Sequence, residues 1–468
     1  MHGRANLRRA AARRVPCAVL LALAQLGAGC ATYHPLPLPS AAHLATRLDQ
    51  LDLTIPAVRG GAPAGRVDVS RPLEVNEIGL LAILNDPELR AQRGERSIAQ
   101  ATQRQTSLLP NPSVSINWEA LMGGPGTQPN WSVSLTQDIT SLITYHRRVR
   151  AARAQTAQVE ANQLWAQWQV AQNARVLAMD AYWGDRAITL SSREQRLIES
   201  EASAVRRELA AGNVDYAALA PLLATQATLD QSLIALQVAR ENTWKELDAL
   251  LGLAPGVRCA IAPPPAASPR ADVESLIESL PRRRPDLVAL QLGYHSADES
   301  LRAAILGQFP TLALGPIWEQ DTTNIRSMGP TGTFDIPLFN RNQAQVAEAR
   351  ATRLMLRDQY QSRLDSAVAE VRALQALIAR TRGDIARSHA AAQSSEQRAR
   401  AARDAYRQGD LDQRSLTDFE SAALERDLET VALQRTLGDA QVSLTVLLGI
   451  GLPQTTLIFP AAQGRRTP

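Results

Sequence analysis

The stretch Gly212-Asn-Val-Asp215 recurs in altered form 197 residues later as Gly409-Asp-Leu-Asp412. From these two points the match runs without a gap to Gly252 and Gly449, and 11 of the 41 aligned residues are identical. Self-similarity at a fixed offset over this length indicates a tandem duplication. The chain is therefore predicted to contain two copies of one structural unit.

Each copy has the same predicted order of elements. A helix of about 22 residues leads into two short strands joined by a loop rich in Gly, Pro and Asn, and a long helical hairpin follows. The expected fold class is mainly α with a small β part. The predicted division is a signal peptide at 1–29, an irregular segment at 30–84, a first repeat at 85–252, a linker at 253–283, a second repeat at 284–449 and a tail at 450–468. We expect the irregular segment, the linker and the tail to meet as a small collar.

The helical hairpins are predicted to be very long. Each copy contains a proline-free stretch that accommodates a helix of about 65 residues, which is about 100 Å at 1.5 Å per residue. Gly212 and Gly409 are expected to form the hairpin turns, and helices of about 35 residues return from them. Because Pro221 falls early in the first returning helix, that helix is expected to start near Ala218.

The predicted strands alternate between apolar and polar residues. Apolar-out, polar-in strands of about ten residues suit a membrane β-barrel, although two hairpins packed on a soluble core show the same period. The export signal described below favours the membrane, as does the absence of other sequence that could cover the apolar faces. The predicted lipid-facing residues are Val114, Ile116, Trp118, Trp131, Val133, Leu135, Leu312, Leu314, Trp318, Phe334 and Ile336.

Four strands cannot close a membrane barrel. Such barrels begin at about eight strands, and an open edge in lipid leaves backbone groups without partners. The barrel must therefore be shared among protomers. Two protomers would give eight strands and a lumen filled by side chains, whereas three would give twelve and leave a passage.

The N-terminus resembles a bacterial export signal. Five arginines precede an apolar run from Val15 through Leu26, which ends in Gly27-Ala-Gly29 before Cys30. A small-residue triplet before cysteine is similar to the lipoprotein signal, in which Cys30 becomes the acylated, palmitate-bearing N-terminus. Plain cleavage of the signal is the alternative. One acyl chain is a marginal anchor, so it would supplement a membrane-embedded part.

Composition argues against several other functions. Removing 1–29 deletes five arginines and no acids, so the formal charge falls from +4 to −1 and a nucleic-acid partner loses its main support. The six histidines are scattered and no cysteine pair exists, so we expect no metal site. No phosphate-binding loop or nucleophile elbow occurs. We therefore expect no catalytic residues, no cofactor and no enzyme activity, and we interpret Cys259 as a linker thiol.

Four stretches resemble a known family, the TolC-like outer-membrane efflux proteins. Asn85-Asp-Pro-Glu-Leu89 and Arg284-Pro-Asp-Leu287 are similar to its paired helix starts. Phe309-Pro-Thr-Leu-Ala-Leu314 is similar to its third strand, and Phe334-Asp-Ile-Pro-Leu-Phe-Asn-Arg-Asn342 to its fourth strand and helix entry. The resemblance extends over about 40–460, and the order and duplicated spacing of these stretches make it specific.

The resemblance implies a homotrimer in the bacterial cell outer membrane, with a twelve-stranded barrel that continues into a periplasmic α-helical barrel. It also implies a passive duct that docks a periplasmic adaptor and an inner-membrane pump, and it leaves the cargo open among drugs, metal ions and proteins. The rival interpretation is a periplasmic adaptor, which normally carries one helical hairpin flanked by several β-domains.

The resemblance further implies a gate at the hairpin turns, closed by acidic and polar residues. The candidate gate residues are Asp215, Asp410, Asp412 and Asp418, which a trimer would repeat as rings. Two of them have a second interpretation, because Asp215 and Asp412 are also placed to cap the returning helices.

Overall fold

A computed structural model of the chain describes residues 33–55, 65–126, 128–264 and 272–450. The chain divides into two units, Met1–Leu44 and Ala45–Pro468, and the described part of the first contains no helix or strand. The elements below all belong to the second. They are η1 (Leu48–Gln50), β1 (Thr54–Ile55), β2 (Gly65–Arg66), α3 (Val75–Asn85), α4 (Pro87–Thr106), β3 (Ser113–Glu119), β4 (Asn130–Asp138), α5 (Ile139–Ala210), α6 (Tyr216–Leu251), α7 (Val273–Arg283), α8 (Pro285–Leu306), β5 (Leu312–Gln320), β6 (Arg326–Phe334), α9 (Gln343–Gln408) and α10 (Gln413–Leu447).

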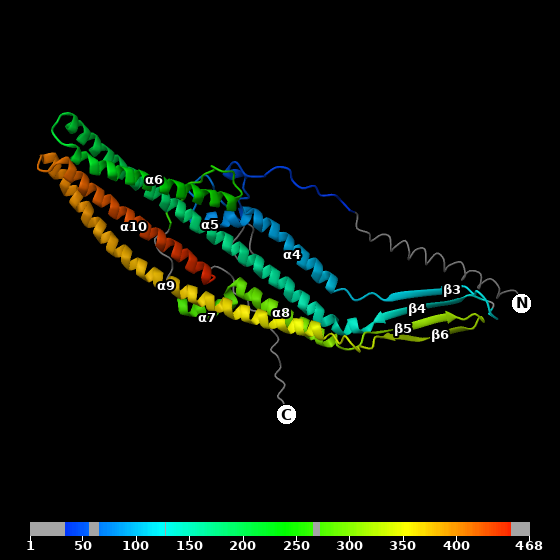
Figure 1. The fold of residues 1–468 in the computed structure, drawn as a ribbon. Coiled ribbons are helices and arrows are strands. Elements are labelled where there is room, and N and C mark those ends of the chain that lie inside the picture. The colour runs from blue at the N-terminus through cyan, green and yellow to red at the C-terminus, as the bar shows by residue number, and fades with distance from the viewer. Residues whose placement is uncertain (1–32, 56–64, 127, 265–271, 451–468) are drawn as a thin grey trace, which may run out of the picture. The chain divides into compact units, whose positions relative to one another are not determined.

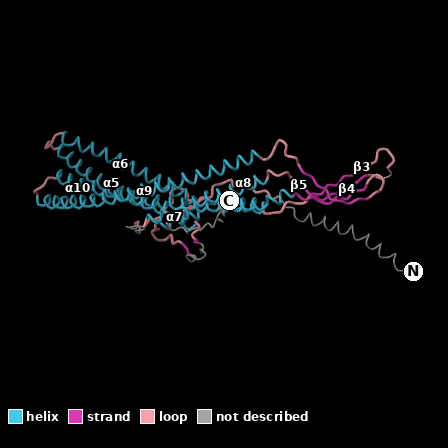
Figure 2. The backbone as a smooth tube through the Cα atoms, turned by 90° about the horizontal axis from the view of Figure 1, so that it is seen from below, coloured by secondary structure: helices cyan, strands magenta, loops and turns pink. Residues whose placement is uncertain are grey.

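The predicted fold class is confirmed. Each copy supplies a strand pair followed by a helical hairpin, and the two pairs join in one antiparallel sheet of order β3-β4-β5-β6. Within the second unit, Figure 1 shows this sheet at one end and the α5–α6 and α9–α10 turns at the other, and Figure 2 shows the same separation from below. The duplication is therefore visible in the fold.

Two continuous helices connect the sheet to the hairpin turns. α5 has 72 residues and α9 has 66, so each is about 100 Å long. Shorter helices lie alongside them: α4 and α6 pack on α5, whereas α8 and α10 pack on both α5 and α9. This is the predicted arrangement of two stacked short helices beside each long one.

Residues of the predicted collar pack on the middle of α5. Leu51, Leu53 and Leu73 share a buried core with α3, α5 and α6, and Leu253 and Cys259 of the linker join it. Backbone bridges connect Ala45 with Leu253 and Leu73 with Ile261. The irregular segment and the linker therefore meet as expected, whereas the third piece, the tail, lies outside the described residues after Ile450.

Three details of the helices differ from the predictions. The segment 30–84 contains most of α3, which begins with a reciprocal capping box between Glu74 and Glu77 rather than with the usual Ser or Thr. The linker contains α7, which includes Pro281 two residues before its end. α6 begins at Tyr216, two residues before the predicted start, and includes Pro221 inside the helix.

A buried charge cluster fixes the start of α8. The Arg284 side chain is 0% exposed, and its guanidinium donates to both carboxylate oxygens of Asp286, at 3.0 and 2.6 Å. Arg363 of α9 donates to the same carboxylate at 2.7 Å, and the Arg284 guanidinium carbon lies 4.9 Å from the ring centroid of Trp165 on α5. The cluster therefore connects α5, α8 and α9.

Candidate functional site

The strand register places the predicted lipid-facing residues within the strands on one face of the sheet. Residues opposite each other in an antiparallel pair point to the same side. Ile116 faces Val133, and Val133 in turn faces Trp318, so one apolar row crosses three strands. The other facing pairs that extend this surface are Val114–Leu135, Trp118–Trp131 and Leu312–Phe334.

This apolar face is open in the single chain, whereas the opposite face is mostly polar. Ile116 is 72% exposed and Trp118 66% exposed. On the polar face, cross-strand hydrogen bonds join Asn117 to Ser132, Asn130 to Glu119, and Ser327 to Glu319. A sheet with a polar face and an exposed apolar face is suited to contact lipid through its apolar face.

The prediction for Ile336 is corrected, because β6 ends at Phe334. The register that pairs Phe334 with Leu312 would pair Ile336 with Pro310, and proline has no N–H to donate to the ladder. Met328 also lies on the apolar face, although the prediction omitted it. It faces Trp318 and is 69% exposed, and Gly and Pro elsewhere in β6 hid the alternation that would have indicated it.

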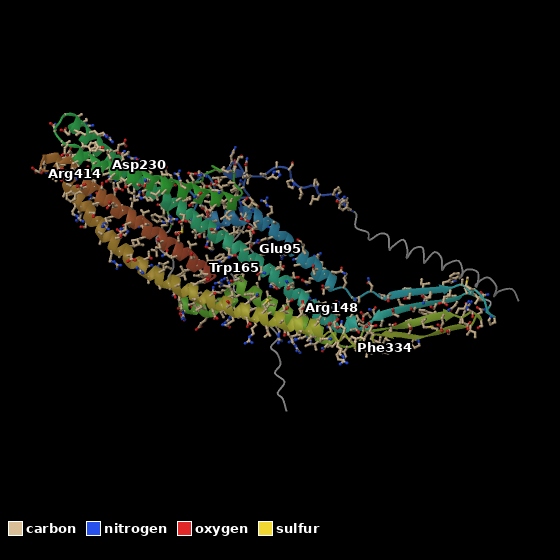
Figure 3. All side chains as sticks on the ribbon, viewed as in Figure 1. Glu95, Arg148, Trp165, Asp230, Phe334 and Arg414 are labelled. Carbon is tan, nitrogen blue, oxygen red and sulfur yellow. The ribbon has the colours of Figure 1, made fainter. Side chains whose placement is uncertain are left out.

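Both edges of the sheet lack a neighbouring strand among the described residues. β3 pairs only with β4, and β6 only with β5. Each edge strand therefore presents a row of backbone donors and acceptors to a further strand. Figure 3 labels Phe334 at the end of β6 that lies next to the helices.

The two hairpin turns are built on left-handed glycines. Gly212 has φ +76° just after α5, and Gly409 has φ +85° at the end of α9. The amides of Asn213 and Asp410 then return to the carbonyls of Glu208 and Ala405, each at 2.9 Å. Such a turn reverses the chain without straining a side chain.

The four gate candidates lie at or just after these turns, and all are exposed. Asp412 caps α10, because its carboxylate accepts from the Ser415 amide at 2.8 Å, which helps to hold the Asp412 pKa below its ordinary value. Asp215 occupies the equivalent position before α6 but makes no side-chain capping bond. Asp410 lies in the second turn, and Asp418 lines a small cavity with Arg398 and Phe419. In Figure 3, Arg414 marks this end of the second unit.

One buried and one half-buried acid lie at the seam between α5 and α10. Glu194 is 5% exposed, and burial together with the nearby charge of Glu425 raises its pKa to about 7. Burial and the charge of Asp180 likewise raise the pKa of Asp439 to about 7, against the opposing effect of Arg435. These two groups change charge near neutral pH.

We expect the packing of α5 against α10 to become less stable as the pH rises from about 5 to about 8. An acid whose pKa is raised by folding keeps its proton in the folded state, so stability is greatest below the unfolded pKa and falls as the pH rises through the folded one. The Glu194→Gln variant should show a shallower fall in melting midpoint over this range than the wild type. Glu199→Gln, an exposed position on the same helix, is the control. Equal slopes for both variants would contradict the assignment.

The comparisons with known proteins agree with this geometry. Residues 276–450 match the model of a family described as outer membrane efflux protein. The match lies in the second half of the chain and agrees with the resemblance found in the sequence. A comparison with curated protein sequences finds no significant match.

Solved outer-membrane channels have a similar fold. The chain is similar to the CmeC outer membrane channel of Campylobacter jejuni, with 14% identity, TM-score 0.68, and coverage of 92% of this chain and 96% of that one. The open-state MtrE outer membrane channel of Neisseria gonorrhoeae gives 17% identity, TM-score 0.65, and coverage of 91% and 99%. The outer membrane protein VceC of Vibrio cholerae gives 19% identity, TM-score 0.63, and coverage of 80% and 96%.

The remaining predictions concern the cysteines, membrane-spanning helices and metal sites. Cys30 and the signal lie outside the described residues. Cys259 is a free thiol buried in the collar core, where burial raises its pKa to about 11 and makes it a poor nucleophile. Across the described ranges, no helix has the length and apolar character to cross a bilayer, and no group of three or more metal-ligating side chains comes together.

Proposed function

We propose that the protein is the outer-membrane channel of a tripartite efflux or secretion system, a passive duct for substrates delivered by a pump. One observation carries the proposal. A four-stranded sheet with an exposed apolar face and two open edges continues directly into two hairpins whose long helices measure about 100 Å. The family match at 276–450 agrees with it.

The duct would be a homotrimer. Three copies of the sheet, with β3 of one beside β6 of the next, give twelve strands and no open edge. A dimer would give a barrel of eight strands, and side chains would fill its lumen. The helical hairpins of the three copies would then form the periplasmic barrel, and the hairpin turns would lie farthest from the membrane.

The adaptor interpretation is less well supported. An adaptor needs one hairpin and several β-domains, whereas this chain has two hairpins and one membrane-type sheet. The similar solved structures named above are outer-membrane channels. An adaptor and an inner-membrane pump are therefore proposed as partners, and acylation of Cys30 as a supplementary anchor in the outer membrane.

Fractionation and planar-bilayer recording test the proposal together. The full-length chain, expressed in a Gram-negative host, should be recovered from the outer membrane only with detergent, as a trimer. The purified trimer should produce discrete conductance steps in a planar bilayer. Release from the membrane after replacement of Cys30 by serine, or the absence of conductance, would overturn the channel proposal.

For the gate, we expect the double variant Asp410→Ala/Asp412→Ala to raise single-channel conductance or open time. Removing two acids per protomer deletes six charges from a narrow trimeric ring, where such rings control ion passage. Asp384→Ala on α9, far from the turn, is the control. Unchanged conductance in the double variant, with a normal trimer yield, would remove both residues from the gate.

A further inference from the structure

A cavity of about 430 Å³ lies where the first turn of α3 and the linker meet α5 and α10. Its volume falls within the range of roughly 300–1,000 Å³ that is typical of small-molecule sites. Val75, Met179 and Val442 supply an apolar wall, and Gln172, Arg175 and Gln441 supply polar groups. The cavity therefore offers both an apolar surface and a cation.

Arg175 has no acidic partner within the described residues. Its Nη1 donates a hydrogen bond to the Gln172 side-chain oxygen at 3.2 Å, whereas its buried Nε has no partner. Gln172 itself is 4% exposed, and its Nε2 is also unpartnered. Burial lowers the pKa of Arg175, which reflects the cost of removing this charge from water.

Two other arginines that reach into the interior each have an acid. Arg284 pairs with Asp286, and Arg258 pairs with Asp248 at 3.1 Å. Glu74 is the only acid among the residues described as lining this cavity, but its carboxylate accepts from the backbone at the start of α3 as half of the capping box. Arg175 is thus a half-buried cation with a buried Nε, and the cavity does not supply its counter-charge.

The position of Arg175 is also fixed by the packing of α3. A Cβ at Gly79 would lie 3.0 Å from Nε of Arg175 and 2.9 Å from the Ala171 carbonyl oxygen. The glycine therefore leaves room for the arginine stem to cross beneath α3. The Arg175 guanidinium carbon lies 5.9 Å from the ring centroid of Trp168, which further restricts it.

We propose that this cavity binds a small organic carboxylate, with its charge on Arg175 and its apolar body against Val75, Met179 and Val442. The planar guanidinium of arginine can donate two parallel hydrogen bonds to one carboxylate. Such charge-assisted bonds are stronger than hydrogen bonds between neutral groups. Gln172 and Gln441 have amide groups that can adjust to the second carboxylate oxygen. The cavity lies between the start of α3, the linker, α5 and α10, away in sequence from the strands and the hairpin turns.

Benzoate binding to the full-length protein in neutral detergent tests the proposal. We expect calorimetric binding and a higher melting midpoint with benzoate, weaker binding of acetate because it lacks the apolar body, and none of benzamide because it lacks the charge. Arg175→Met should weaken benzoate binding by about tenfold or more. Arg193→Met is the matched control, since Arg193 is exposed on the same helix.

A second variant keeps the test independent of how well Arg175→Met folds. Asn76 is exposed and lines the cavity on the first turn of α3, so Asn76→Glu introduces a carboxylate beside Arg175. This variant should melt at a higher temperature than the wild type and should no longer bind benzoate. Equal binding of benzoate and benzamide, no benzoate binding by the wild type, or unchanged binding in Asn76→Glu would overturn the proposal.

Discussion

Replacing Asp286 with alanine should lower the free energy of unfolding by about 3–5 kcal/mol, the usual cost of removing one partner from a buried ion pair. The substitution leaves Arg284 fully buried with no carboxylate, although the Nη1 atom of that guanidinium already lacks a hydrogen bond. It also removes the acceptor of Arg363 from the first turn of α8, where a negative charge favours the helix dipole.

The pH dependence of the same site gives a second measure. Burial acts to raise the pKa of Asp286, but the hydrogen bonds and charges of Arg284 and Arg363 outweigh it and hold the pKa below its ordinary value. A carboxylate whose pKa is lowered by folding stabilises the protein above its unfolded pKa, and that contribution is lost as the pH falls through the folded pKa. The difference between wild type and Asp286→Ala should therefore shrink in acid.

Two comparison variants separate this effect from a general one. Glu278→Ala changes an exposed acid on α7 and should alter stability by less than about 0.5 kcal/mol. The double variant Arg284→Met/Asp286→Leu replaces both charges with apolar groups and should regain most of the loss. Denaturant unfolding followed by tryptophan fluorescence measures all three. If the free energy of unfolding of Asp286→Ala lies within about 1 kcal/mol of the wild-type value, the cluster does not hold α8 in place.

The features that the sequence predicted are those that depend on local patterns. Glycines at 212 and 409 adopt the left-handed conformation that ends a helix, and each long proline-free stretch contains one continuous long helix, α5 or α9. Alternation in β3 and β4 sets the face of each side chain, and the strand register preserves that face across the sheet. Such signals need no knowledge of distant residues.

The features that the sequence missed depend on contacts between distant residues. Arg284 and Arg363 meet at one carboxylate although they are far apart in the chain, and no spacing rule connects them. Glu194 reads as an ordinary helix-surface acid until α10 covers it. Ile336 follows the alternation but has Pro310 opposite it, which only the register reveals.

Replacing Gly315 with valine should abolish nearly all trimer, because this glycine lies where the two sequence repeats of one protomer join. Gly315 is on β5, and a Cβ there would sit 1.7 Å from the backbone carbonyl oxygen of Leu135 on β4. A backbone atom cannot move aside as a flexible side chain can, so the β4–β5 pairing would have to open. Since the proposed barrel needs that pairing in every protomer, one substitution would break it three times.

Gly329→Val on the neighbouring strand β6 is the matched control. Gly329 faces Ile317, so it lies on the same polar side of the sheet as Gly315, but a Cβ there meets nothing within 4 Å. The measurement is the amount of trimer in unheated outer-membrane samples on denaturing gels. Valine at both positions adds the same bulk and the same preference for strands, so only the contact with Leu135 differs. Equal trimer yields from the two variants would mean that close β4–β5 pairing does not join the two repeats of a protomer. The strands of one protomer would then enter the barrel as two separate hairpins.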